Sequence, residues 1–169
     1  MTLTLSAIDG LDAAGFVAAL GAIYEDSPWV ADAAYATRPF ATIEALLAAL
    51  RAAVDTAGEA RHVALIRAHP DLAGKAARAG ALGEHSTREQ AGLGLDRLSD
   101  EEFERFHRLN DAYKARFGFP FVIAVRRHTK ESILAAFEVR LAHDRATEIA
   151  EALANIHLIA ELRLRDLIA

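Results

Sequence analysis

His69 is the residue of this chain whose type and placement most favour catalysis. It follows the apolar stretch of residues 63–66 and stands directly before Pro70, which biases its backbone away from the helical region. The sequence therefore predicts an imidazole held at a helix end, where a group that titrates near neutrality could act as a general acid or base. Taken alone, a His-Pro pair more often has a structural role, with the histidine satisfying a backbone group at the helix terminus.

Ser86 and Glu89 form a second ambiguous pair. Their spacing is that of a capping box, in which both side chains satisfy N–H groups at the start of a helix, and the sequence alone favours this local interpretation. In the alternative, Glu89 orients or protonates a catalytic group while Ser86 binds a substrate. A carboxylate beside a histidine shifts the proton affinity of both groups, so this alternative stays open.

Two arginines lie on or beside the apolar stripes of expected helices. The stripe of the last helix consists of Ile149, Leu153, Ile156, Ala160 and Leu167, and that of the preceding helix of Ile133, Phe137 and Leu141. Arg163 falls on the first stripe, where a charge should be paired or face a ligand. The alternative is that Arg163 reaches the surface or pairs with a structural carboxylate. Arg140, beside the second stripe, is the weaker candidate.

Several motifs of metal or phosphate chemistry are incomplete. The seven histidines include no His-Glu-x-x-His pair, and the single Glu-x-x-His at Glu104 and His107 is too little for a di-iron bundle, so no metal site is expected. Gly74 and Lys75 lack the remaining residues of a P-loop. A basic cluster at residues 126–130 is interpreted as a solvated helix entry that could also attract an anionic substrate.

Composition excludes several broad classes. The 169 residues are 53% hydrophobic and 25% charged, which argues against disorder, and the net charge of −5 argues against nucleic acid as the main partner. The absence of cysteine excludes disulfides, zinc–thiolate sites and thiol catalysis, and fits a reducing compartment. No apolar stretch approaches the roughly 18 residues that would span a membrane, and residues 1–10 show no secretory signal. The expected location is cytoplasmic.

The elements that must position these residues are predicted to be helices, because apolar residues recur at intervals of three and four. The expected helical segments are residues 12–24, 29–39, 42–55, 59–68, a short stretch after residue 71, 86 to 92 or 94, 99–117, 129–142 and 144–168. The predicted N-caps are Thr42, Asp71, Ser86, Ser99, Thr129 and Asp144. Residues 118–123 contain a glycine and a proline and are expected to form an ordered loop. The fold class is therefore all-α, a compact single-domain bundle of about eight helices over residues 1–169.

Five blocks of the sequence together resemble a known family. They are residues 24–30 (YEDSPWV), 69–75 (HPDLAGK), 86–92 (STREQAG), 117–123 (FGFPFVI) and 159–164 (IAELRL). In this order they resemble the signature blocks of the OHCU decarboxylases, which act on 2-oxo-4-hydroxy-4-carboxy-5-ureidoimidazoline (OHCU) in urate breakdown. Each block alone is weak, but five in register over nearly the whole chain are a specific signal.

The resemblance implies an all-helical carboxy-lyase that works as a homodimer without a cofactor and converts OHCU to (S)-allantoin. It implies His69 as the catalytic acid/base, with Glu89 beside it. The residues that it implies for substrate binding are Pro70, Ser86, Gln90, Phe121, Val122, Ile123 and Arg163, the backbone of residues 121–123 meeting the polar groups of the ring. Arg140 remains the alternative to Arg163. Arg127 and His143 depart from the residues expected at their positions, though neither has a proposed role in catalysis.

Two other functions stay open at this stage. One is a cofactor-independent lyase or hydrolase that acts on a different ureido or imidazoline ring. The other is a helical interaction module without enzymatic activity, in which His69 and Arg163 are structural.

Overall fold

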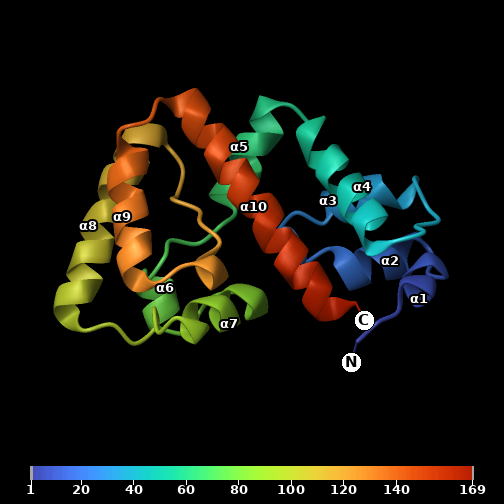
Figure 1. Ribbon diagram of the computed structural model, residues 1–169, viewed down its shortest axis with the longest axis horizontal. Coiled ribbons are helices and arrows are strands. Elements are labelled where there is room, and N and C mark those ends of the chain that lie inside the picture. The colour runs from blue at the N-terminus through green and yellow to red at the C-terminus, as the bar shows by residue number, and fades with distance from the viewer. Residues whose placement is uncertain (1, 169) are drawn as a thin grey trace. The chain divides into compact units, whose positions relative to one another are not determined.

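The computed structural model describes residues 2–168 and consists of helices joined by short loops (Figure 1). The α-helices are α1 (Leu5–Asp9), α2 (Ala13–Leu20), α3 (Trp29–Tyr35), α4 (Ile43–Asp55), α5 (Glu59–Arg67), α6 (Lys75–Arg78), α7 (Glu84–Gly92), α8 (Asp100–Phe117), α9 (Lys130–Leu141) and α10 (Arg145–Leu167), with a 3₁₀ turn, η1 (Val125–Arg127), before α9. Within the described residues the only β-type pairing is an isolated bridge between Leu3 and Ile168. Eight of these α-helices have seven residues or more, which confirms the predicted all-α class and helix number.

Four of the predicted N-caps are confirmed. Thr42 accepts a hydrogen bond from the backbone N–H of Ala45 at 3.1 Å, and Asp144 accepts one from Thr147 at 2.7 Å. Ser99 and Thr129 both form complete capping boxes, at the starts of α8 and α9. Each of these caps satisfies an N–H group that has no partner inside its helix.

The other two predicted caps are wrong. Helix α7 begins at Glu84 with Gly83 as its N-cap, so Ser86 already has helical backbone in the first turn and cannot cap the helix. Helix α6 begins after Gly74 and not after Asp71, whose carboxylate instead pairs with Lys114 of α8 at 2.6 Å. Local spacing identifies residues that are able to cap, but these two helices start at other positions, after Gly83 and after Gly74.

The N-terminal region also differs from expectation. Helix α1 was not predicted, and α2 ends at Leu20 rather than near residue 24. Gly21 is the C-cap of α2, and a Cβ atom at this position would lie 2.6 Å from the Val17 carbonyl oxygen, so glycine is the residue that fits here. The chain then turns through Asp26, which has a positive φ of 42°, before Pro28 opens α3.

The chain divides into two compact units: residues up to 68 together with those from 157 onward, and His69–Ile156. We call them unit 1 and unit 2. In unit 1, helices α2, α3 and α4 pack together around Phe16, whose ring lies 5.5 Å from that of Tyr35. In unit 2, α8 and α9 lie side by side, as Figure 1 shows. Rings from both helices belong to an aromatic core, in which the centroids of Phe106 and Phe137 lie 6.3 Å apart. That core consists of Phe106, Tyr113, Phe117, Phe119, Phe121 and Phe137. A single domain over residues 1–169 remains a prediction.

The buried face of α10 is shifted from the predicted stripe. Ile149 and Leu153 are only half-buried, whereas Glu148 and Ala152 are fully buried. Arg163 lies on the buried face, as predicted, with 2% of its surface exposed. On α9, Arg140 takes a place in the buried row after Ile133 and Phe137, whereas Leu141 is half-buried. Both helices therefore bury charged residues where the predicted stripes had aliphatic ones.

Among the described residues, no helix combines the length and the apolar character that crossing a membrane would require.

Candidate active site

The segment His69–Gly74 connects α5 to α6 and is held by two helices of unit 2. The side-chain oxygen of Gln90, on α7, accepts the N–H of Ala73 at 2.9 Å, and its amide nitrogen donates to the Asp71 carbonyl at 3.4 Å. Asn110, on α8, donates to the Leu72 carbonyl at 2.8 Å. Side chains replace regular secondary structure as partners for this backbone, which fixes the geometry of the segment that begins with His69.

His69 is buried, with 7% of its surface exposed, and Pro70 after it is half-buried. Helix α5 ends at Arg67, so His69 stands two residues beyond the last helical residue, as the His-Pro pattern predicted. An imidazole in this position is withdrawn from bulk water and attached to a rigid backbone. Those are the conditions under which a histidine can deliver a proton in a defined direction.

Helix α7 supplies three of the predicted site residues from one region of its surface. Ser86 and Gln90 are four residues apart, and Glu89 is three residues after Ser86, so the three side chains lie on neighbouring positions of the helix. Ser86 and Gln90 are buried and Glu89 is half-buried. Since Gln90 contacts the backbone of residues 71 and 73, α7 and the segment that contains His69 are joined directly.

The predicted loop after α8 is ordered and buried. Gly118 takes left-handed geometry, with φ of 79°, which ends α8 and turns the chain back. Phe121, Val122 and Ile123 are all buried, and the Phe121 ring stacks on Phe137 with 3.7 Å between centroids. The loop leads into η1, which packs against α7. Unit 2 thus brings together α7, the segment after His69 and the end of the loop.

Arg163 belongs to unit 1, where its Nη1 donates to Glu25 at 2.9 Å. Glu25 follows Tyr24, whose hydroxyl lies 2.8 Å from Nδ1 of His157, and Nε2 of the same ring lies 3.0 Å from Asp55. Burial lowers the pKa of His157, with an opposing effect from Asp55, and burial raises the pKa of Tyr24. The lowered pKa of His157 favours a neutral imidazole, and the raised pKa of Tyr24 favours an un-ionised phenol.

Sequence reasoning missed Glu25 and Glu148 as partners of the two buried arginines. Glu148 has no exposed surface and pairs with Arg140 at 2.8 Å. Glu148 lies four and eight residues before the buried Ala152 and Ile156. This helical spacing is a sequence signal that could have placed its charge on the buried face, as it did for Arg163. For Glu25, which follows α2 in an irregular stretch, no periodicity was present to mark it. Among the described residues, no cluster of His, Asp or Glu has the composition of a metal site.

Comparison with known proteins gives matches over nearly the whole chain. The family model of OHCU decarboxylase matches residues 9–165. A 2-oxo-4-hydroxy-4-carboxy-5-ureidoimidazoline decarboxylase from Haloferax volcanii is 45% identical over 164 residues, which cover 97% of this chain and 95% of the relative. The uric acid degradation bifunctional protein of Bacillus subtilis is 37% identical over 98% of this chain, although the match covers 33% of that longer protein.

A solved structure agrees with these matches. The crystal structure of (S)-allantoin synthase aligns with a TM-score of 0.76 and 34% identity, covering 98% of this chain and 54% of that chain. The helical fold and the sequence matches define a decarboxylase of the carbon–carbon lyase class. The chain belongs to the OHCU decarboxylase family.

Proposed function

We propose that this protein converts OHCU to (S)-allantoin and carbon dioxide in urate breakdown. The observation that carries the proposal is the family match over residues 9–165, with 45% identity to a relative that has this name. The local structure supports it, because the backbone after His69 is held by Gln90 and Asn110.

The reaction requires few catalytic groups from the protein. Breaking the bond between the carboxylate and the ring leaves an electron pair, which the neighbouring ring carbon–nitrogen double bond can accept, so carbon dioxide leaves without a cofactor. A proton must then be added to one face of the ring to give one enantiomer. The protein therefore has to orient the carboxylate and deliver that proton.

In this proposal His69 delivers the proton and Glu89 sets its orientation or protonation. Ser86 and the backbone of Phe121, Val122 and Ile123 hold the polar groups of the ring. Pro70 contacts the substrate beside His69. Gln90 has a second part, because its amide also holds the backbone of the segment that starts at His69.

Arg163 is the proposed partner of the substrate carboxylate. The family resemblance supports Arg163, whereas Arg140 donates to Glu148 and to the carbonyl of Val122 and so has a part in holding the loop. Arg163 donates to Glu25 through Nη1. A guanidinium has five N–H donors in a planar fork, so pairing with Glu25 is compatible with holding a second carboxylate.

We also propose that the protein is a cytoplasmic homodimer. The family resemblance supports the dimer, and the absence of cysteine fits a reducing compartment. Light scattering after size exclusion should give twice the mass of the 18.3 kDa chain. Fractionation of the native cells should recover the protein with cytoplasmic markers. A monomer at all concentrations, or recovery in another fraction, would contradict the respective part of this proposal.

The test of the activity generates OHCU in place from urate, with a urate oxidase and a hydroxyisourate hydrolase. Circular dichroism then follows the appearance of allantoin after this protein is added. The proposal predicts rapid formation of the S enantiomer. Slow, racemic allantoin at the uncatalysed rate, from protein shown to be folded, would contradict the substrate assignment. Other ureido and imidazoline rings would then be tested in the same way.

A further inference from the structure

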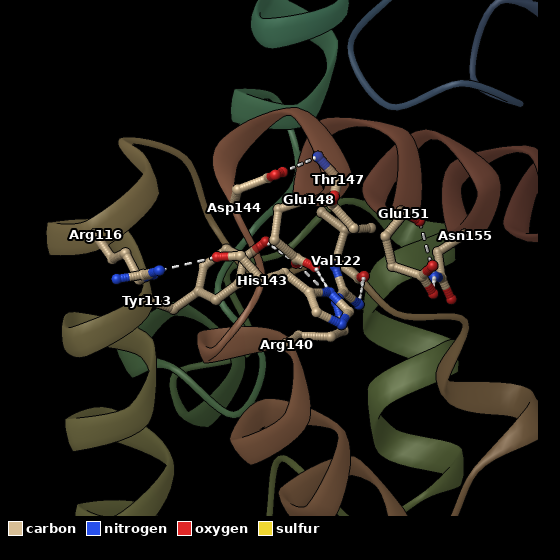
Figure 2. Close-up of polar contacts among 10 residues, drawn as sticks. All are labelled: Tyr113, Arg116, Val122, Arg140, His143, Asp144, Thr147, Glu148, Glu151 and Asn155. Atoms are coloured by element: carbon tan, nitrogen blue, oxygen red, sulfur yellow. Dashed lines mark hydrogen bonds and ion pairs between the residues drawn. The ribbon is translucent and has the colours of Figure 1, made fainter.

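Unit 2 contains a buried polar network that the proposed reaction does not use (Figure 2). Its centre is Glu148, whose Oε1 accepts hydrogen bonds from Tyr113 at 2.5 Å and from Nε of Arg140 at 2.8 Å. Its Oε2 lies 2.9 Å from Nδ1 of His143. Burial and the hydrogen bond to Glu148 raise the pKa of Tyr113, which keeps its hydroxyl a donor. A carboxylate without solvent exposure is thus satisfied by three side chains, one from α8 and two from the end of α9 and the residues after it.

Arg140 connects this network to the loop of residues 118–124. Its Nη1 donates to the Val122 carbonyl at 2.7 Å, and its guanidinium carbon lies 4.2 Å from the centroid of the Phe121 ring. Since Nε is bound to Glu148, the planar guanidinium cannot rotate without breaking one of the two hydrogen bonds. Arg140 therefore holds the backbone carbonyl of Val122 and contacts the ring of Phe121, the residue before it.

Asn155, on α10, holds the same loop at a second point. Its side-chain oxygen accepts the N–H of Ala124 at 3.1 Å, while its amide nitrogen donates to the Glu151 carbonyl at 3.0 Å. The second bond orients the amide, so that the oxygen faces the loop. Figure 2 shows Asn155 with Glu151 on one helix, near the network around Arg140.

The two contacts lie on either side of Ile123 and fix both of its peptide groups. In a planar trans peptide, the carbonyl of one residue and the N–H of the next point in opposite directions. Holding the Val122 carbonyl therefore sets the direction of the Ile123 N–H, away from Arg140. Holding the Ala124 N–H likewise sets the direction of the Ile123 carbonyl, away from Asn155. One residue thereby presents a donor and an acceptor with fixed orientations.

We propose that Arg140 and Asn155 are positioning residues, which aim the N–H and the carbonyl of Ile123 at a complementary amide edge of the substrate ring. This inference rests on the proposed function, in which the backbone of this loop contacts the ring. A ring edge that carries N–H and C=O side by side is the chemical feature that such a pair recognises. Arg140 and Asn155 act through the loop and do not touch the substrate themselves.

The first test separates positioning from stability at Arg140. Arg140→Met leaves Glu148 buried without its cation, so it should unfold at a lower temperature than the wild type. The double variant Arg140→Met/Glu148→Gln removes both charges and should recover most of the thermal midpoint. It still lacks the donor to Val122, so KM for OHCU should stay about 10-fold or more above the wild-type value, with a smaller change in kcat.

Asn155→Leu tests the second contact, because leucine has similar volume but cannot accept the Ala124 N–H. Asn155→Leu should also raise KM for OHCU. The matched controls are Arg116→Met and Glu151→Gln. Arg116 donates to the backbone of His143, and the Glu151 side chain contacts Asn155, so each borders the network without holding the loop. Both controls should keep wild-type KM and kcat.

Amide hydrogen exchange over residues 119–125 provides a readout that does not require activity. Exchange should be faster in Asn155→Leu and in the double variant, and unchanged in the two controls. Recovery of wild-type KM together with stability in the double variant would overturn the proposal, as would unchanged exchange in both loop variants. If the wild type itself does not decarboxylate OHCU, the proposed function fails, and the exchange result still decides whether Arg140 and Asn155 hold the loop.

Discussion

Helices α7 and α8 both contain Ser-x-x-Glu near their starts, but only α8 uses the pattern as a cap. At α8, Ser99 accepts the N–H of Glu102 at 3.2 Å, and Glu102 accepts the N–H of Ser99 at 3.0 Å. At α7, Gly83 is the N-cap and no side chain caps the helix. Starting α7 at Glu84 places Ser86 inside the helix, where it is buried. The same four-residue pattern therefore stabilises a helix end in one place and provides candidate active-site groups in the other.

The strongest test of this contrast is Glu89→Gln. If Glu89 works with His69, loss of its charge should reduce kcat by about 10²- to 10⁴-fold, the usual contribution of acid–base groups. The thermal midpoint should change little, because Glu89 does not cap α7. Steady-state kinetics on OHCU generated in place, with thermal unfolding alongside, measures both quantities. A variant that loses stability but retains kcat would show that Glu89 has a structural role and no part in catalysis.

Ser86→Ala and Ser99→Ala form a matched pair with a smaller expected effect. Ser86→Ala should reduce kcat/KM by about 10-fold, as expected from loss of one hydrogen bond to the substrate. Ser99→Ala should lower the free energy of unfolding by about 1 kcal/mol, as for other N-cap serines.

Activity of the Ser99→Ala variant should equal that of the wild type below its unfolding temperature. The comparison between α7 and α8 would be broken if Ser86→Ala proved to be the destabilising member of the pair and Ser99→Ala the inactive one.

The smallest expected effect is a pH dependence at the α8 cap. The Ser99 backbone N–H, and then Lys130, hold the pKa of Glu102 below its usual value of 4.5. A carboxyl whose pKa is lowered on folding stabilises the folded state above its unfolded pKa, and this contribution is lost as the pH falls through the folded value. The thermal midpoint of Glu102→Gln should therefore approach that of the wild type below about pH 4.5. A constant difference between the two proteins from pH 7 to pH 3 would contradict this.

The caps of α4, α8, α9 and α10 could be predicted because each depends on hydrogen bonds within four residues of sequence. The position of His69 after α5 was predictable for the same reason, since Pro70 acts on its immediate neighbour. The start of α7 could not be predicted in this way. The spacing of Ser86 and Glu89 indicates a start at Ser86, but it contains no information about the alternative start after Gly83. Sequence periodicity located the helices, but this boundary lies after Gly83, where no side chain caps the helix.

The buried partners of the two arginines could not be predicted from spacing along the sequence. Arg140 and Glu148 belong to different helices, and their pairing depends on how α9 and α10 pack in unit 2. The contact of Gln90 with the backbone of residues 71 and 73 is also tertiary. The resemblance to the family predicts Gln90 as a site residue but contains no information about these partners.

In the proposed function, His69 delivers the proton that makes the reaction stereospecific. The most direct test compares His69→Ala with the wild type and with His107→Ala, a half-buried histidine of α8 that pairs with Asp111. Circular dichroism should show rapid formation of (S)-allantoin by the wild type and by His107→Ala. His69→Ala, folded and with an unchanged far-ultraviolet spectrum, should give only slow racemic product. Formation of (S)-allantoin by His69→Ala at the wild-type rate would contradict the account.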